Sequence, residues 1–495
     1  MTADHRRGRV FQSAALALSL GLAACASLPE ATPSATLLDA PSLGLDSAKD
    51  GKPVAGQWWR EFGDAQLDRL VGQALQNNPN LKLTQARLAR ARSFSDVTRA
   101  AGRPQLNASL DLTHQRYTQN GLIPPPLAGA IQDTGTLQLG ASWELDFFGK
   151  NRAALDAALG SANAAQADAQ AARMLLASQV ARGYFQLLRI NEQLTVAQRA
   201  LTQREETLAL VRDRVNAGLD TRLELRQSEG GLPEARLQIE MLEEQAAWAR
   251  HALAALTAQP NAAAGMQLPA LSAIKAIATE PVIPADLLGR RADVAAARWR
   301  VQASVQDVAH ARTLFYPNVN LVAFAGFSSI GLDRLLDAGS QQWGVGPAVR
   351  LPIFDGGRLR ANLRGKTADL DAAIESYNAV LIDAVRDAAD QVSSIQSIAR
   401  QKTEQEAAQQ ATESAYEIAV LRYRAGLGNY LQVLSAETAV LSQRRLAVDL
   451  AARALDTQVA LIRALGGGAH SDGLDAGQGD SKAADDALAA AIARH

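Results

Sequence analysis

The chain repeats one order of elements twice, at an offset of roughly 210 residues. The first copy runs from about residue 70 to 265 and the second from about 286 to 468. In each copy a helical pattern leads to a proline, two stretches of alternating apolar residues, an aromatic-glycine end and a very long helical run that is broken by an Ala-Gly turn. A unit of this length is too long for a solenoid repeat, so we expect two halves that share one fold.

The first 25 residues have the layout of a bacterial secretory signal. Arg6, Arg7 and Arg9 form a positive start, and Val10–Ala24 is an apolar run too short to span a bilayer. The run closes with Leu-Ala-Ala-Cys, which fits a lipobox, so we predict that residues 1–24 are removed and that Cys25 carries a lipid on its thiol. Cys25 is the only cysteine, which excludes a disulfide bond. Alanine follows it, and this indicates sorting to the outer membrane.

Composition and charge exclude several classes of function. The chain has 50 basic and 51 acidic residues, so no basic surface for nucleic acid is expected. The six histidines are scattered without ligand-like spacing, and no dinucleotide loop or nucleophile elbow is complete, so we expect no metal site, no cofactor and no enzyme. No stretch after Cys25 is apolar for the ~20 residues of a transmembrane helix. A membrane crossing would therefore have to use strands.

Four stretches alternate apolar and polar residues with the period of a β-strand: 106–113, 136–147, 319–327 and 343–353. Each is near the ~9–11 residues that a tilted transmembrane strand needs, with its apolar face toward lipid and its polar face toward a lumen. A soluble sheet packed on one face would show the same alternation. Four transmembrane strands cannot close a wall, so the membrane interpretation requires several copies of the chain.

Two helical runs, residues 152–217 and 359–425, contain no proline and would each reach ~100 Å. A glycine turn follows each run, at Gly218 and Gly426, and a second long helix follows each turn. Apolar residues recur at every seventh position before and after the first turn and after the second: Val180, Leu187, Leu194, Leu201, Leu208 and Val215; Leu225, Leu232, Ile239, Ala246 and Leu253; Leu427, Leu434, Leu441, Val448, Leu455 and Ile462. This period predicts two left-handed coiled-coil hairpins with the glycine turns at their tips. The alternative, a leucine-zipper-like dimerisation rod, does not explain the interleaved strands.

Several short motifs resemble a known family in their order and duplication. They are Trp58–Asp64 (WWREFGD), Asn77–Leu81 (NNPNL), Arg214–Leu219 (RVNAGL), Leu351–Gly357 (LPIFDGG) and Arg422–Leu427 (RYRAGL). With the lipobox, they resemble the TolC family of outer-membrane factors, and within it the OprM/NodT-like lipoproteins. The resemblance implies a mostly α fold with a small transmembrane β part. It also implies a homotrimer in which a twelve-stranded β-barrel in the outer membrane continues into a long periplasmic α-helical barrel.

The resemblance implies a function and partners as well. The expected function is a passive exit duct for small molecules or drugs in a tripartite efflux system. Its partners would be a periplasmic adaptor (membrane fusion) protein, an inner-membrane pump of the resistance-nodulation-division type, and outer-membrane lipid. Two alternatives stay open: the same duct in a type I protein-secretion system, and a lipid-anchored coiled-coil scaffold without a pore.

The predicted organisation has six parts. A signal peptide (1–24) and a lipid-anchor tether (25–57) precede the first half (58–265); a linker (266–285), the second half (286–466) and a disordered tail (467–495) follow.

The resemblance also points to a periplasmic gate at the hairpin tips. In the family, acidic, arginine and tyrosine side chains close the tunnel there. Glu224, six residues after Gly218, and Tyr423 match family positions, and Arg222 and Arg424 are candidate partners of Glu224. The family acids and basic residue of the second tip are replaced in this chain, by Gln432, Ser435 and Gly428. The alternatives are solvated charges that contribute only ~0–1 kcal/mol each, or an apolar ring that involves Leu427 or Leu431.

The turns themselves are the expected contact with the adaptor. The residues are Ala217, Gly218, Leu219, Ala425, Gly426 and Leu427.

Overall fold

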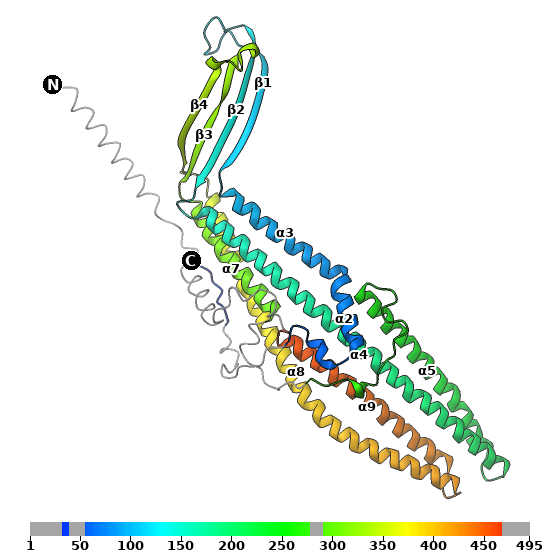
Figure 1. Cartoon of the computed structure of the whole chain (residues 1–495). Coiled ribbons are helices and arrows are strands. Elements are labelled where there is room, and N and C mark those ends of the chain that lie inside the picture. The colour runs from blue at the N-terminus through cyan, green and yellow to red at the C-terminus, as the bar shows by residue number, and fades with distance from the viewer. Residues whose placement is uncertain (1–31, 39–54, 278–290, 468–495) are drawn as a thin grey trace.

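The computed structural model describes residues 32–38, 55–277 and 291–467. The molecule is elongated, with a β-sheet at one end and the tips of two helical hairpins at the other (Figure 1). Several predicted segments lie wholly or partly outside the described residues: the signal peptide, Cys25, most of the tether, part of the linker, and the tail from residue 468 onward.

From α3 in the first half and α7 in the second, both halves have the same order of elements, as the sequence predicted. After a short 3-10 helix, Trp58–Phe62, the first half contains α2 (Ala65–Asn77), α3 (Pro79–Ala101), β1 (Gln105–Arg116), β2 (Ile131–Leu145), α4 (Lys150–Asn216) and α5 (Arg222–Thr257). The second half contains α7 (Ala292–Thr313), β3 (Asn318–Ile330), β4 (Gln341–Arg350), α8 (Arg358–Arg424) and α9 (Tyr430–Ala464). The long helices α4 and α8 each have 67 residues. The chain is therefore duplicated in structure as well as in sequence.

The two halves join in one antiparallel sheet with the strand order β1-β2-β3-β4. Leu139 of β2 lies opposite Ala108 of β1 and Ala325 of β3, so the apolar positions of neighbouring strands share one face. On the opposite face Gln342 donates to Gln138 across β3, with Nε2 and Oε1 3.3 Å apart. The alternation thus produces one apolar and one polar face.

No helix in the described parts of the chain has the length and apolar character to cross a membrane.

Helix α4 packs against α2, α3, α5, α7 and α9, and α8 packs against α7 and α9. The largest apolar cluster lies around α2, α4, α5 and α9 and includes Trp58, Phe62 and Phe185. Several residues of the seven-residue pattern, among them Val180 and Leu253, are fully buried, whereas Leu427 at the second tip is exposed. The heptad period predicted these hairpins, and burial of its apolar positions stabilises them.

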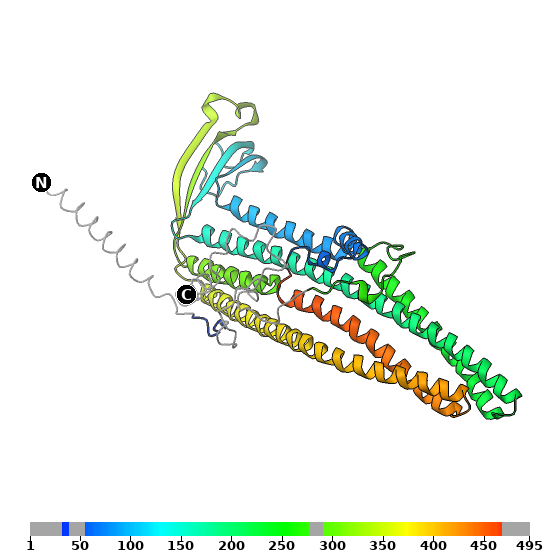
Figure 2. The same ribbon diagram turned by 60° about the horizontal axis from the view of Figure 1, so that its bottom comes forward.

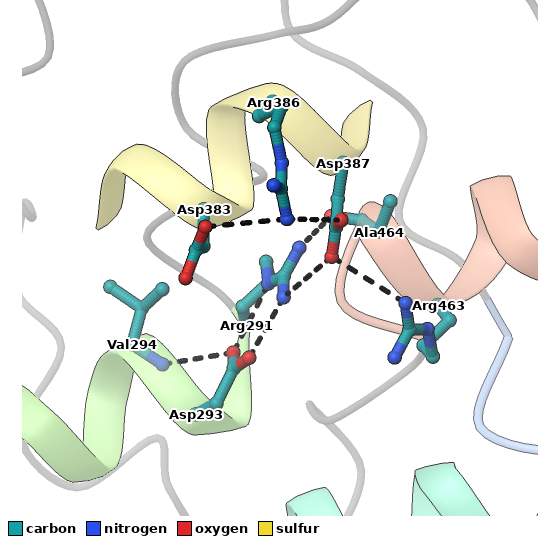
Figure 3. A network of polar contacts seen from close by, with 8 residues as sticks. All are labelled: Arg291, Asp293, Val294, Asp383, Arg386, Asp387, Arg463 and Ala464. Carbon is teal, nitrogen blue, oxygen red and sulfur yellow. Dashed lines mark hydrogen bonds and ion pairs between the residues drawn. The ribbon is translucent and has the colours of Figure 1, made fainter. Parts of the chain in front are cut away.

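A cluster of charged side chains fastens the start of α7 to the middle of α8 and the end of α9 (Figure 3). Arg291 lies at the centre, with only 7% of its side chain exposed, and its Nη2 is 2.8 Å from Asp293 and 3.7 Å from Asp387. Asp387 also pairs with Arg463 of α9 at 3.5 Å. The root of the second hairpin is therefore held by charges on three helices.

Part of the predicted tether lies against α8. Asp371 accepts the backbone N–H groups of Ser34 and Ala35 at 2.8 and 3.0 Å. Asn378, two turns further along α8, accepts the N–H of Leu38 at 2.9 Å and donates to Thr36. Residues 32–38 are therefore fixed to the second half.

Candidate functional site at the hairpin tips

The two hairpin tips lie side by side at the end of the molecule far from the sheet (Figure 2). Each turn closes its helix with a Schellman motif, in which Leu219 N–H donates to Arg214 O and Leu427 N–H donates to Arg422 O, both at 2.8 Å. The turns require a left-handed residue, and Gly218 (φ 72°) and Gly426 (φ 75°) supply it. The Ala-Gly sequence therefore fixes the shape of both tips.

One polar network joins the two tips within the chain. The hydroxyl of Tyr423, on α8, donates to the carboxylate of Asp220, which lies in the first turn. Arg214, on α4, donates to the same carboxylate through Nε at 2.9 Å and Nη2 at 3.3 Å. Its Nη1 also donates to the carbonyl of Tyr423 at 3.1 Å, and its guanidinium lies 4.6 Å from the centre of the tyrosine ring. We call these three residues the tip triad.

The tip triad is shielded from solvent. The side chains of Arg214 and Asp220 are 11% and 10% exposed, and Tyr423 is buried. The hydrogen bond from Arg214 lowers the pKa of Asp220, although partial burial opposes it, and the hydrogen bond from Tyr423 lowers it further. Burial and the bonded Asp220 carboxylate both raise the pKa of Tyr423. Near neutral pH the acid is therefore ionised and the phenol keeps its proton, as the hydrogen bonds require.

An apolar cluster supports the triad. Tyr423 packs with Val211 of α4 and with Tyr430 and Val433 of α9. The two tyrosine rings lie 6.1 Å apart, centre to centre. Because this cluster contains side chains from both hairpins, separating the tips would expose apolar surface as well as break hydrogen bonds.

The carboxylate of Glu224 bonds within its own hairpin, whereas the hydroxyl of Tyr423 bonds to Asp220. Glu224 is the third residue of α5, and its carboxylate accepts the backbone N–H of Thr221 at 2.9 Å and the Thr221 hydroxyl. This is a capping box, which satisfies N–H groups at the start of a helix. Arg222 and Arg424 are exposed, and within the described chain neither forms an ion pair with Glu224. Within one chain the carboxylate that joins the two tips is thus that of Asp220, and the role of Glu224 at the gate stays a prediction.

Sequence reasoning missed Arg214 and Asp220. Asp220 lies two residues after its turn glycine, and the matching position of the second half is Gly428. A Thr-x-x-Glu pattern at residues 221–224 was also available as the signal of a capping box. These two observations together would have favoured Asp220 as the acid free to bond across the tips.

The predicted adaptor contacts are all at the surface. Leu219 and Leu427 are 65% and 70% exposed, and Leu223 and Leu431 beside them are 62% and 63% exposed. Ala217 and Ala425 and the two glycines of the turns are exposed too. Large apolar side chains at such a tip are typical of a surface that another protein covers.

The described residues include no group of three or more His, Cys, Asp or Glu side chains placed to hold a metal ion. The chemistry of the tips is that of hydrogen bonds, charge and apolar packing.

Comparison with known proteins identifies close relatives. A sequence model of a family described as "Outer membrane efflux protein" matches residues 70–259 and 283–467, one match in each half. The fusaric acid resistance protein FusA of Burkholderia cepacia is 37% identical over 364 residues, 72% of this chain and 69% of FusA. The multidrug resistance outer membrane protein MdtQ of Escherichia coli is 32% identical over 464 residues, 91% of this chain and 96% of MdtQ. The solved structure of the outer membrane protein VceC of Vibrio cholerae is similar with a TM-score of 0.80 and 36% identity, over 84% of this chain and 99% of VceC.

Proposed function

Because this chain belongs to the family of outer membrane efflux proteins, we propose that it works as a homotrimeric exit duct of a tripartite efflux system. The observation that carries this proposal is the sheet: it has one apolar and one polar face, and β1 and β4 are its two edges. Open edges are not tolerated in hydrocarbon, so further copies of the chain have to complete the wall. Three copies supply twelve strands, within the range of known outer-membrane channels.

The helices extend the duct into the periplasm. A helix of 67 residues is ~100 Å long at 1.5 Å per residue, enough to carry the tunnel far from the membrane. The exposed leucines of the tips, Leu219 and Leu427, offer an apolar surface to a periplasmic adaptor protein. An inner-membrane pump of the resistance-nodulation-division type would supply the cargo, and a lipid on Cys25 would add membrane affinity.

The tip triad holds the periplasmic end closed in the resting duct. Each protomer contributes two hairpins to that end, and Arg214, Asp220 and Tyr423 link one hairpin to the other. Charge-assisted hydrogen bonds to a shielded carboxylate are stronger than exposed ion pairs, so the link favours one fixed arrangement of the tips. Docking of the adaptor on the neighbouring leucines would then favour the separated arrangement.

The names of the relatives suggest cargo to test. Fusaric acid and unrelated antibiotics are suitable probes, because FusA and MdtQ are described by resistance to them.

The test is purification of the full-length lipidated protein, measurement of its mass in detergent, and recording of single channels in a planar bilayer. We expect trimers with a low conductance that rises when the tips are opened. Monomers, or trimers that conduct no ions in any variant, would refute the duct.

A further inference from the structure

Helix α5 contains a section that is intrinsically weak as a helix. Gly230 and Gly231 have low helix propensity, and Pro233 has no N–H to donate to the carbonyl of Glu229. The duplicated helix α9 has Thr-Ala-Val-Leu at the matching positions 438–441, which lack both glycine and proline. The weak section is therefore specific to the first hairpin, although both hairpins have nearly equal length.

Arg204 of α4 holds this section in place. Its Nη1 donates to the carbonyl of Gly231 at 2.8 Å and lies 3.2 Å from the carboxylate of Glu234. Its Nε donates to Glu437 of α9 at 2.8 Å. The side chains of Arg204 and Glu437 are only 15% and 7% exposed. One guanidinium thus ties the weak section of α5 to α4 and to the second hairpin.

Further polar contacts lie nearby. Arg444 of α9 donates to Glu413 of α8 at 3.0 Å and to Gln203 of α4 at 3.3 Å. Gln405 of α8 is buried and donates to the carbonyl of Gln443 at 3.1 Å. Together with Arg204, these contacts form a polar layer that includes residues of all four hairpin helices.

The polar layer lies between two apolar clusters, and buried apolar side chains such as Leu208 and Val440 lie in the same interval. On α4 the large cluster ends at Ala197 and the tip cluster begins at Val211. On α9 the large cluster ends at Val448 and the tip cluster includes Val433. Polar layers inside coiled coils fix the register of the helices and contribute less stability than apolar layers. The hairpins are therefore expected to bend most easily at the polar layer.

We propose that Arg204 is a positioning residue of the periplasmic closure, and that residues 230–233 of α5 are the hinge that it locks. The proposal rests on the duct function proposed above. With Arg204 in place, the part of α5 below the hinge is aligned with the second hairpin, and the tip triad can form. Without Arg204, the first hairpin bends at the hinge and the triad loses its alignment, although its own residues are unchanged.

The test uses full-length trimers and two measurements, hydrogen exchange of the amides in residues 226–237 and conductance in a planar bilayer. In Arg204→Met we expect exchange to accelerate roughly tenfold or more, as for loss of a hydrogen bond to a charged group, and conductance to rise. Adding Gly230→Ala, Gly231→Ala and Pro233→Ala should restore slow exchange and low conductance. A β-carbon at Gly230 has open space and one at Gly231 only ordinary contacts, so both replacements fit.

Two further variants sharpen the test. Arg182→Met removes another α4–α9 pair, Arg182 Nε to Asp456 at 2.5 Å, from an exposed position outside the hinge level, and should change neither measurement. Arg204→Lys keeps a positive charge near Glu437 but lacks the second guanidinium nitrogen that donates to Gly231. Its exchange rate and conductance should therefore lie between those of the wild type and of Arg204→Met. It replaces Arg204→Met if that variant does not assemble.

Three results would overturn the proposal. They are an unchanged exchange rate in both Arg204 variants, equal changes of exchange and conductance in Arg182→Met and Arg204→Met, and fast exchange that persists when the three alanine replacements are added to Arg204→Met. A wild-type trimer that never conducts would refute the duct instead, and the exchange measurement would still decide the role of Arg204.

Discussion

Replacing Asp220 by asparagine should open the periplasmic end. Asparagine keeps the shape of the side chain but removes the charge, and its amide group places a donor where Arg214 and Tyr423 both donate. Asp220 accepts charge-assisted hydrogen bonds from both residues, each worth about 1.5–3 kcal/mol. Water that enters after the change offsets part of this loss, so we expect the closed arrangement to be destabilised by about 3 kcal/mol per protomer. At 1.4 kcal/mol per factor of ten, the open arrangement gains about a hundredfold.

The assay compares Asp220→Asn with Glu224→Gln in assembled trimers. Glutamine preserves the capping box at Thr221, so Glu224→Gln should change little, whereas Asp220→Asn should raise single-channel conductance and sensitise cells to vancomycin. Thermal stability of the trimer serves as the control for assembly. If Glu224→Gln opens the channel and Asp220→Asn does not, the acid that closes the end faces a neighbouring subunit and the tip triad is only structural.

Three other predictions concern pH, the sheet and the anchor. The pKa of Asp220 is lowered in the folded protein, so the stabilisation of the closed tips by Asp220 is present above the ordinary pKa of an aspartate, about 4, and is lost as the pH falls through the lowered value. The pKa of Tyr423 is raised, so the stabilisation by Tyr423 is present below the ordinary pKa of a tyrosine, about 10, and is lost as the pH rises through the raised value. Conductance should therefore be flat between these limits and rise on acidification below pH 4, and Asp220→Asn should abolish that acid rise. Leu139→Arg on the apolar face of the sheet should cost roughly 2–4 kcal/mol and reduce trimer yield, whereas Gln138→Arg on the polar face should leave the yield intact and change conductance; equal losses would mean that the faces are misassigned. Cys25→Ala should abolish labelling by a radioactive fatty acid, and label that persists on this variant would contradict lipidation at Cys25.

Much of the fold follows from local signals. The alternation of period two predicts the strands, and the seven-residue period predicts the hairpins, because each records which face of an element is buried. The turns follow from Gly218 and Gly426, since a left-handed residue is required at those points. These signals occur in the same order in both halves of the sequence. The duplicated architecture could therefore be predicted before any contact between the halves was known.

The tip triad and the Arg204 contacts were decided by the tertiary structure. Tyr423 and Asp220 are 203 residues apart, and Arg204 and Glu437 are 233 residues apart. A sequence pattern indicates which face of a helix is apolar, but it does not give the rotation and axial position of one hairpin against the other. Those two quantities determine that Tyr423 lies against Asp220 while Glu224 turns back to cap α5. Spacing from the glycine turn therefore identified the tip, and packing between the two hairpins showed which acid links them.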